Sequence, residues 1–151
     1  MPQSEQFENI DSNDRGYDTS LYKIVEHSTF VYNPARINVG SIAFNDSIEK
    51  AIVSSLYVCF KTNGDIDDYF LQDFLQTSEF KSSVLASGEG GVRIYLFYEN
   101  FAEIKINYPS YDEQQSITNC LSSLKNKLKN ETQIVNAYQS QKSYFLKELI
   151  I

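Results

Sequence analysis

The residues best suited to chemistry in this chain are four carboxylates near its middle: Asp65, Asp67, Asp68 and Asp73. Such a cluster could hold a metal ion or transfer protons. Its spacing does not match that of a calcium-binding loop. Asp65 stands where a helix is expected to begin, and acidic residues suit the positive end of a helix dipole. We therefore favour capping over a metal or acid/base site as the role of the cluster.

No set of residues for nucleophilic catalysis can be assembled. The only histidine is His27, which we expect at a surface or half-buried strand position, and a nucleophile would need a histidine or a similar base beside it. The two cysteines, Cys59 and Cys120, have no metal-ligand spacing and suggest no disulfide, which fits a reducing cytoplasm. The sequence predicts no catalytic residue, no metal site and no cofactor.

Two short motifs suggest ligand loops. Residues 88–91 read Gly-Glu-Gly-Gly, but the Gly-Lys-Ser/Thr of a phosphate loop does not follow them, so a flexible loop is preferred. Asn33-Pro34 resembles the asparagine-proline loop of amino-methyltransferases. Ala35 and Arg36 stand where that loop has a second proline and an aromatic residue, so we interpret the segment as a turn between strands.

The formal net charge of −7 is spread unevenly. Residues 1–30 hold six acids and two bases (−4), residues 31–112 eleven acids and six bases (−5), and residues 113–151 three acids and five bases (+2). Because DNA-binding proteins usually carry a basic surface, this balance argues against a nucleic-acid partner unless one face is locally basic. No signal peptide is recognised, and no apolar run approaches the roughly 20 residues of a membrane span.

Patterning predicts an α+β fold, with a small, mostly antiparallel sheet domain, short helices and one long C-terminal helix. A hydrophobic fraction of 42% is enough for a packed core. A helix is expected over residues 65–80, a small-residue loop over 81–91 and a turn or short helix at 98–101. The expected strands cover residues 21–25, 28–32, 37–44, 51–61, 92–96 and 103–108.

The last segment, residues 110–151, contains no glycine or proline and predicts one helix roughly 55–60 Å long. Ser110 and Glu113 form a capping box at its start. Its apolar residues repeat with alternating spacings of four and three, the seam of a coiled coil, with Glu131 and Lys142 as polar seam members. An amphipathic helix on its own domain is the alternative. The apolar seam residues are Ile117, Leu121, Leu124, Leu128, Val135, Tyr138, Phe145 and Leu149.

The order of these segments closely resembles the specificity subunit of type I restriction-modification systems, over the later part of one target-recognition domain and the helix behind it. The resemblance runs from about Leu21 to Ile151. The family has a Tyr-Asn-x-x-Arg…Gly-Ser segment, a Val-Ser-x-x-Tyr strand, a Tyr-Phe/Leu helix, a Gly-(Val/Ile)-Arg turn and a Pro-x-x-x-Glu-Gln junction. The matching residues are Tyr32, Asn33, Arg36, Gly40 and Ser41; Val53, Ser54 and Tyr57; Tyr69 and Phe70; Gly91, Val92 and Arg93; Pro109, Glu113 and Gln114.

The resemblance implies a subunit that performs no chemistry itself. Such subunits have two recognition domains, each reading half of a split site in double-stranded DNA, and two antiparallel helices that set the distance between the halves. They dock modification subunits, which methylate adenine with S-adenosylmethionine, and restriction subunits, which use ATP and magnesium. The residues that we expect to contact DNA are Tyr32, Asn33, Arg36, Asn38, Ser41, Lys61, Lys81 and Arg93.

We divide the chain into a flexible or truncated lead-in (1–20), a partial target-recognition domain (21–109) and a spacer helix (110–151). The chain has no tryptophan, although the family begins such a module with a tryptophan-containing strand. A half-length or truncated subunit is expected, pairing through its helix with a second copy or another specificity module. The alternative is an assembly protein with a functional coiled coil and a degenerate globular part that no longer binds DNA. An enzyme is the third possibility.

Overall fold

The most buried strand is β2, Thr29–Tyr32, which forms the centre of a three-stranded antiparallel sheet. The computed structural model describes residues 21–90 and 94–149. Strands β3, Ile42–Asn45, and β5, Val58–Phe60, flank β2, so the strand order is β3-β2-β5. Phe30 pairs in register with Phe44 on one side and Phe60 on the other, which places three aromatic rings on one face. These residue types favour strands because their bulky side chains pack well on a pleated surface.

A second, two-stranded sheet is formed by β1, Lys23–Glu26, and β4, Lys50–Val53. The pairing is antiparallel, with Ile24 opposite Ile52. The prediction of one strand over 51–61 is wrong, because the segment turns at Ser54 and supplies β4 to one sheet and β5 to the other. The Tyr57 amide donates a hydrogen bond to the Ser54 carbonyl (3.0 Å), and the Leu56 amide donates to the Ser54 hydroxyl oxygen (3.4 Å). Serine residues favour such turns by offering the backbone a local hydrogen bond.

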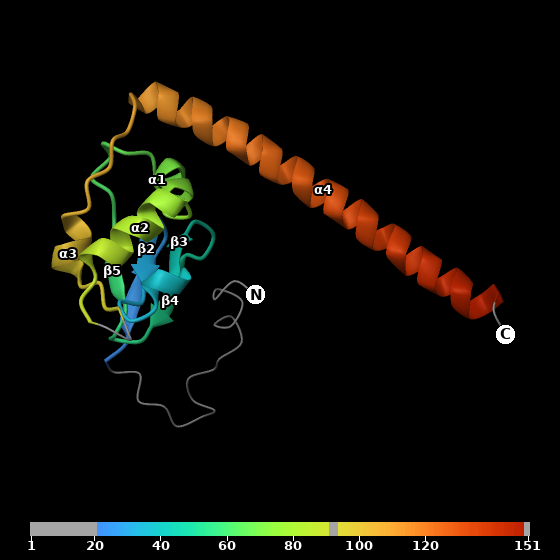
Figure 1. Cartoon of the computed structure of the whole chain (residues 1–151), viewed down its shortest axis with the longest axis horizontal. Helices are drawn as coiled ribbons and strands as arrows, with labels where there is room; N and C mark the ends of the chain where they lie inside the picture. Colours follow the sequence, from blue (N-terminus) through green and yellow to red (C-terminus); the bar gives the residue numbers. More distant parts are fainter. Residues whose placement is uncertain (1–20, 91–93, 150–151) are drawn as a thin grey trace. The chain divides into compact units, whose positions relative to one another are not determined.

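Four short helices complete the described residues 21–90 and 94–108. The helices α1 and α2 lie over the three-stranded sheet (Figure 1). The core they enclose is aromatic: Phe30 stacks on Phe44 and Phe60 with ring centroids 4.5 and 5.1 Å apart, and Phe80 of α2 is almost fully buried. The helices are the 3₁₀ helix η2, Ile37–Val39; α1, Asp68–Phe74; α2, Ser78–Ser87; and α3, Tyr98–Ala102.

The predicted helix over 65–80 is two helices. Helix α1 ends at its C-cap Leu75, and Thr77 begins α2 by accepting a hydrogen bond from the Phe80 amide (3.2 Å). The prediction of a loop over 81–91 is therefore wrong for residues 81–87, which belong to α2. The small residues there suggested a loop, but burial of Phe80 and Val84 stabilises helix instead.

The structure also corrects the strands predicted over residues 37–44, 92–96 and 103–108. Residues 37–39 form η2, so the strand predicted over 37–44 begins only at Ile42. In the segment 92–96, residues 92 and 93 lie outside the described residues, and Tyr95 makes an isolated bridge to Glu89. No strand forms over 103–108, where the chain follows α3 in irregular conformation and Ile104 packs against the core. The short helix expected at 98–101 is confirmed as α3.

The chain divides into two units, up to Tyr108 and from Pro109 onward. The second unit contains the long helix α4, Tyr111–Leu149, which confirms the predicted α+β class with a long C-terminal helix. Its seam residues are exposed apart from the half-buried Leu121, with Leu128 exposed to 69% and Tyr138 to 67%. An apolar stripe of this kind is typical of a helix that binds a partner. Among residues 21–90 and 94–149, no helix combines the length and apolarity that a membrane crossing requires.

Candidate nucleic-acid interface

The connection from β2 to β3, residues 33–41, carries four of the predicted DNA contacts and is held in one conformation by its own hydrogen bonds. The Asn33 side-chain oxygen accepts the Ala35 amide (3.0 Å), and the Arg36 amide donates to the Asn33 carbonyl (3.0 Å). Asparagine followed by proline favours this turn, because the asparagine side chain mimics a backbone acceptor. The turn predicted at Asn33-Pro34 is thus confirmed. It leaves Arg36 exposed and buries Ile37 among the core residues.

Gly40 closes the connection and returns the chain to β3. Its φ of 87° is a left-handed conformation that glycine adopts without strain. The Ser41 amide then donates to the Arg36 carbonyl (3.1 Å), and the Asn33 amide donates to the Ser41 carbonyl (3.0 Å). The backbone of Arg36 is therefore tied to the start of β3. An arginine on such a support loses less conformational freedom when it binds than one on a loose loop.

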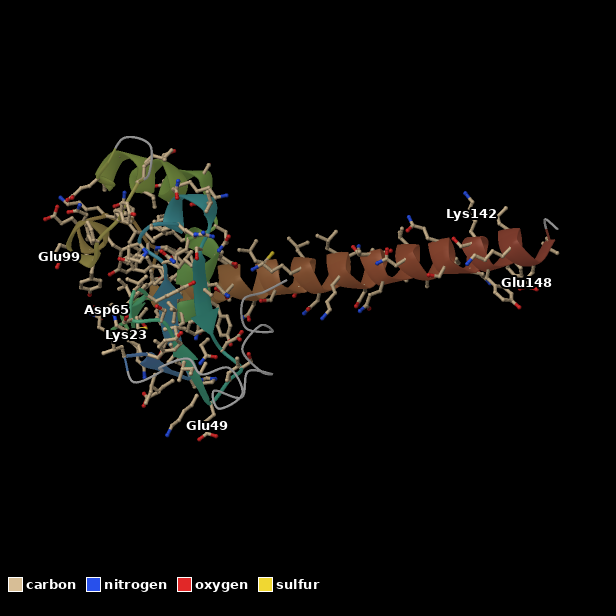
Figure 2. The ribbon with its side chains drawn as sticks, turned by 90° about the horizontal axis from the view of Figure 1, so that it is seen from below. Lys23, Glu49, Asp65, Glu99, Lys142 and Glu148 are labelled. Carbon is tan, nitrogen blue, oxygen red and sulfur yellow. The ribbon has the colours of Figure 1, made fainter. Side chains whose placement is uncertain are left out.

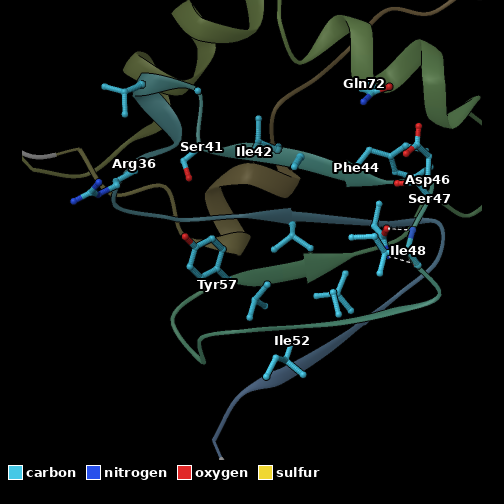
Figure 3. A pocket seen from close by; sticks show the side chains of 18 residues that line it. Arg36, Ser41, Ile42, Phe44, Asp46, Ser47, Ile48, Ile52, Tyr57 and Gln72 are labelled. Atoms are coloured by element: carbon cyan, nitrogen blue, oxygen red, sulfur yellow. Dashed lines mark hydrogen bonds between the residues drawn. The ribbon is translucent and has the colours of Figure 1, made fainter. Parts of the chain in front are cut away.

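Arg36 and Ser41 line one open groove of about 650 Å³, here called the inter-sheet groove, which lies between β3 and β4. Figure 3 shows it running from Arg36 at one end to Asp46 at the other. Gln72, from α1, also lines it. The Ser41 hydroxyl is buried and has no hydrogen-bond partner among the described residues. The groove thus offers both hydrogen-bond donors and hydrogen-bond acceptors along an apolar wall that includes Ala43 and Ile52.

The other predicted contact residues are distributed over the unit. Asn38 is half-buried in η2, and Lys81 is exposed on α2. Lys61 lies at the opposite end of the three-stranded sheet, because β5 runs antiparallel to β2 and Val58 rather than Phe60 pairs with Tyr32. Its ammonium group makes an ion pair with Glu26 at 3.2 Å. Arg93 lies outside the described residues.

Tyr32 has no exposed surface and belongs to the core, where its ring stacks on Phe101 with centroids 5.1 Å apart. Burial, together with the nearby groups of Glu99 and Tyr98, raises its pKa to about 12. Its hydroxyl has no hydrogen-bond partner among the described residues. In this conformation Tyr32 supports the connection it precedes and does not present a surface to a ligand.

The carboxylates near α1 have local structural roles, as the capping interpretation expects. Asp67, not Asp65, is the N-cap: its side chain accepts the Phe70 amide at 2.9 Å. The Asp65 carboxylate accepts a hydrogen bond from the Asn63 side chain (2.6 Å), and that of Asp68 accepts one from Thr62 (2.6 Å). Within the described part of the chain, no three histidine, cysteine or acidic side chains are grouped so as to hold a metal ion.

Gly88 serves the packing of its own segment, and Gly91 lies outside the described residues. The Gly88 amide donates to the Val84 carbonyl at the end of α2 (3.0 Å). A Cβ at Gly88 would lie 2.1 Å from Cγ2 of Ile94, so the close approach of these two segments excludes any larger residue. His27 is exposed at the turn between β1 and β2, where its Nε2 lies 2.9 Å from the Asp46 carbonyl oxygen.

Gln72 and Asp46 are candidate site residues that the sequence did not reveal. Gln72 lies in a helix that was predicted from the spacing of its apolar residues, a pattern that gives no role to a polar residue. Asp46 lies in a turn. Both reach the inter-sheet groove through tertiary packing between segments that are distant in sequence. The exposed aromatic pair Tyr95 and Phe97, stacked with ring centroids 6.1 Å apart, was also missed, because the region was predicted as a strand.

A family model described as "Type I restriction modification DNA specificity domain" matches residues 12–137. The match covers most of the chain, including the groove and much of α4. The class of protein is thus a DNA specificity domain, and the chain belongs to the type I restriction modification DNA specificity domain family. It is a DNA sequence-specificity module of these systems. No curated protein matches the chain significantly.

Proposed function

We propose that this chain reads one half of a bipartite DNA site, performs no chemistry itself and docks the modification subunits that methylate the DNA. Restriction subunits of the same system would join the resulting complex. The family match supports the general role of DNA recognition. The finer assignment rests on the inter-sheet groove and on α4.

The observation that carries the proposal is the exposed Arg36 on its hydrogen-bonded support at the end of the groove. Its guanidinium has no acidic partner within ion-pair distance among the described residues. Arginine contacts phosphate or the edge of guanine through paired N–H groups. Gln72 adds a side chain of the kind that binds base edges, while the Ser41 hydroxyl is buried beside the groove.

The remaining sequence-predicted contacts that the structure describes do not line the inter-sheet groove. Asn33 and Asn38 flank Arg36 in the same connection. Lys61, Lys81 and Arg93 are candidates for phosphate contacts, which strengthen binding without selecting a sequence. In the proposed complex the exposed seam of α4 pairs with a second long helix, either from another copy or from another specificity module, and so brings a second half-site reader into the assembly.

The test is a selection from random-sequence DNA with the full chain and its cognate modification subunits. The expected result is enrichment of two short motifs separated by a fixed gap. Arg36→Ala should weaken binding to the selected DNA by about 1–3 kcal/mol and relax selection at one position. Lys105→Ala removes the same charge from a residue that does not line the groove, and it serves as the control.

Two results would count against the proposal. If the chain binds its modification subunits but no sequence is enriched, it does not read DNA, and the coiled-coil assembly role with a degenerate globular part is favoured. If Arg36→Ala and Lys105→Ala have equal effects on affinity and on the selected sequence, Arg36 contributes only general charge, and the inter-sheet groove is not the reading surface.

A further inference from the structure

Gln72 has a side-chain amide that lies half-buried at the inter-sheet groove. This amide makes no hydrogen bond with any other residue that the structure describes. A glutamine amide has one acceptor oxygen and two N–H donors, and a partly buried site makes it costly to leave them without partners. The amide of Gln72 is therefore free to bind a ligand that offers a donor and an acceptor side by side.

Helix α1 holds Gln72 in a fixed place beside the groove. Tyr69, three residues earlier, packs edge-on against Phe44 of β3, with ring centroids 5.6 Å apart. Leu75, three residues later, is buried in the aromatic core. Figure 3 shows Gln72 on α1, toward the opposite end of the groove from Arg36. Because its helix is anchored on both sides of it, Gln72 loses little backbone freedom when its amide binds.

Few charges surround the groove. Arg36 and Asp46 are the only charged residues that line it among those described. Other acidic side chains are exposed elsewhere on the sheet unit, and Figure 2 shows those of Glu49, Asp65 and Glu99 at separate places on it. A phosphate contact favours a cation, whereas a neutral amide beside apolar side chains suits the hydrogen-bonding edge of a base.

We propose that Gln72 selects the adenine of one A·T pair in the half-site. In the major groove adenine presents the N7 acceptor beside the N6 amino donor, and a glutamine amide matches both at once. The thymine of the same pair presents a methyl group, which suits the apolar side chains of Phe44 and Ile48 that line the groove with Gln72. This inference rests on the proposed function, DNA reading through the inter-sheet groove, and adds the base that one residue selects.

A change of specificity tests this role in the full chain with its cognate modification subunits. Gln72→Glu replaces the amide by a carboxylate of the same shape, which only accepts hydrogen bonds and matches the amino group of cytosine. Selection from random-sequence DNA should then replace adenine by cytosine at one position and keep the other positions. Gln76→Glu makes the same change at an exposed residue that does not line the groove, and it should keep the adenine.

Modified DNA provides a second readout that uses the wild-type chain. The base 7-deazaadenine lacks the N7 acceptor and is placed in turn at each adenine of the selected DNA. At one of them it should weaken wild-type binding about twofold to tenfold, the usual contribution of one hydrogen bond. With Gln72→Ala it should have no effect at that adenine, because the bond is already absent. Alanine favours helix, so this variant retains α1.

The outcomes separate this inference from the proposed function. The wild type can select a motif that Gln72→Glu leaves unchanged at every adenine. In that case the chain reads DNA, and the role of Gln72 is overturned. The same conclusion follows if 7-deazaadenine weakens binding of the wild type and of Gln72→Ala equally at every adenine. If the wild type selects no sequence at all, the proposed function and this inference are both wrong.

Discussion

The hydroxyl of Ser110 donates a hydrogen bond to the Glu113 carboxylate at 2.7 Å, and the Ser110 amide donates to the same oxygen at 3.1 Å. These two bonds lie at the N-terminal end of α4 and supply the glutamate half of the predicted capping box. Hydrogen bonds to a carboxylate favour its ionised form, and they lower the pKa of Glu113 below its ordinary value.

Glu113→Gln is expected to reduce the acid sensitivity of α4. Because the folded-state pKa of Glu113 is lowered, its stabilising effect is present above the ordinary glutamate pKa and is lost as pH falls through the folded value. Circular dichroism between about pH 6 and pH 3 should show a loss of helix signal that is smaller in the variant. Asp112→Asn is the control. If it removes the acid-dependent step equally, general first-turn charge rather than the Ser110 bonds explains that step.

Tyr32→Phe is expected to stabilise the sheet unit or leave it unchanged at neutral pH. The hydroxyl is buried without a partner among the described residues, so its removal relieves a desolvation cost of about 1 kcal/mol. In the folded chain, burial raises the pKa of Tyr32 to about 12. The neutral hydroxyl therefore contributes stability below about pH 10, and this contribution is lost as the pH rises toward 12.

Urea unfolding at about pH 7 and about pH 11 should therefore show a smaller alkaline loss of stability in Tyr32→Phe than in the wild type. Tyr69→Phe, at an exposed tyrosine, should retain the loss seen in the wild type. A large destabilisation by Tyr32→Phe at neutral pH would show that the hydroxyl does have a partner and that the assigned core environment is wrong.

Asp67→Ala is expected to lower the free energy of unfolding of the sheet unit by about 1 kcal/mol, the usual contribution of an N-cap. The reason is loss of the bond from the Phe70 amide to the Asp67 carboxylate. Asp65→Ala removes a similar carboxylate from an exposed turn and should have a smaller effect. Urea denaturation followed by far-ultraviolet circular dichroism gives both values. Equal losses would contradict the assignment of Asp67 as the cap.

This shift of the cap from Asp65 to Asp67 illustrates what the sequence could predict. A local pattern located the acidic helix start but not its exact residue, because several nearby carboxylates can cap. Likewise, the apolar run 51–61 correctly indicated strand, but only its pairing with β1 and β2 shows that it divides at Ser54. The long helix was predicted almost completely, since its heptad pattern is local and uninterrupted.

The candidate site was harder to predict. The segment containing Asn33 and Arg36 was found from short motifs, and its turn follows from the Asn-Pro pair. Gln72 joins the same groove only because α1 packs beside the sheet, which no short-range pattern encodes. Tyr32 was expected at the interface because it belongs to the same motif, but strand alternation places it with Phe30 on the core face.

Leu124→Asp combined with Leu128→Asp is expected to abolish pairing of α4 and leave the sheet unit folded. Both leucines are exposed in the single chain, so the change does not disturb the core of the sheet unit. In a dimer it would bury four unpaired carboxylates, which is strongly destabilising. Light scattering should report a monomer, while near-ultraviolet circular dichroism from the core aromatic residues stays unchanged. A dimeric double variant would show that pairing uses another surface.

Inserting one heptad with apolar seam residues after Asn136 should lengthen the spacer without changing its seam. Seven residues of helix add about 10 Å. If two antiparallel copies of α4 set the separation of the half-site readers, the selected DNA gap should widen by about three base pairs, at about 3.4 Å each. Inserting the same heptad before the first strand, after Gly16, leaves α4 unchanged and is the control. An unchanged gap with the α4 insertion, in a variant that still dimerises, would show that α4 does not set the half-site spacing.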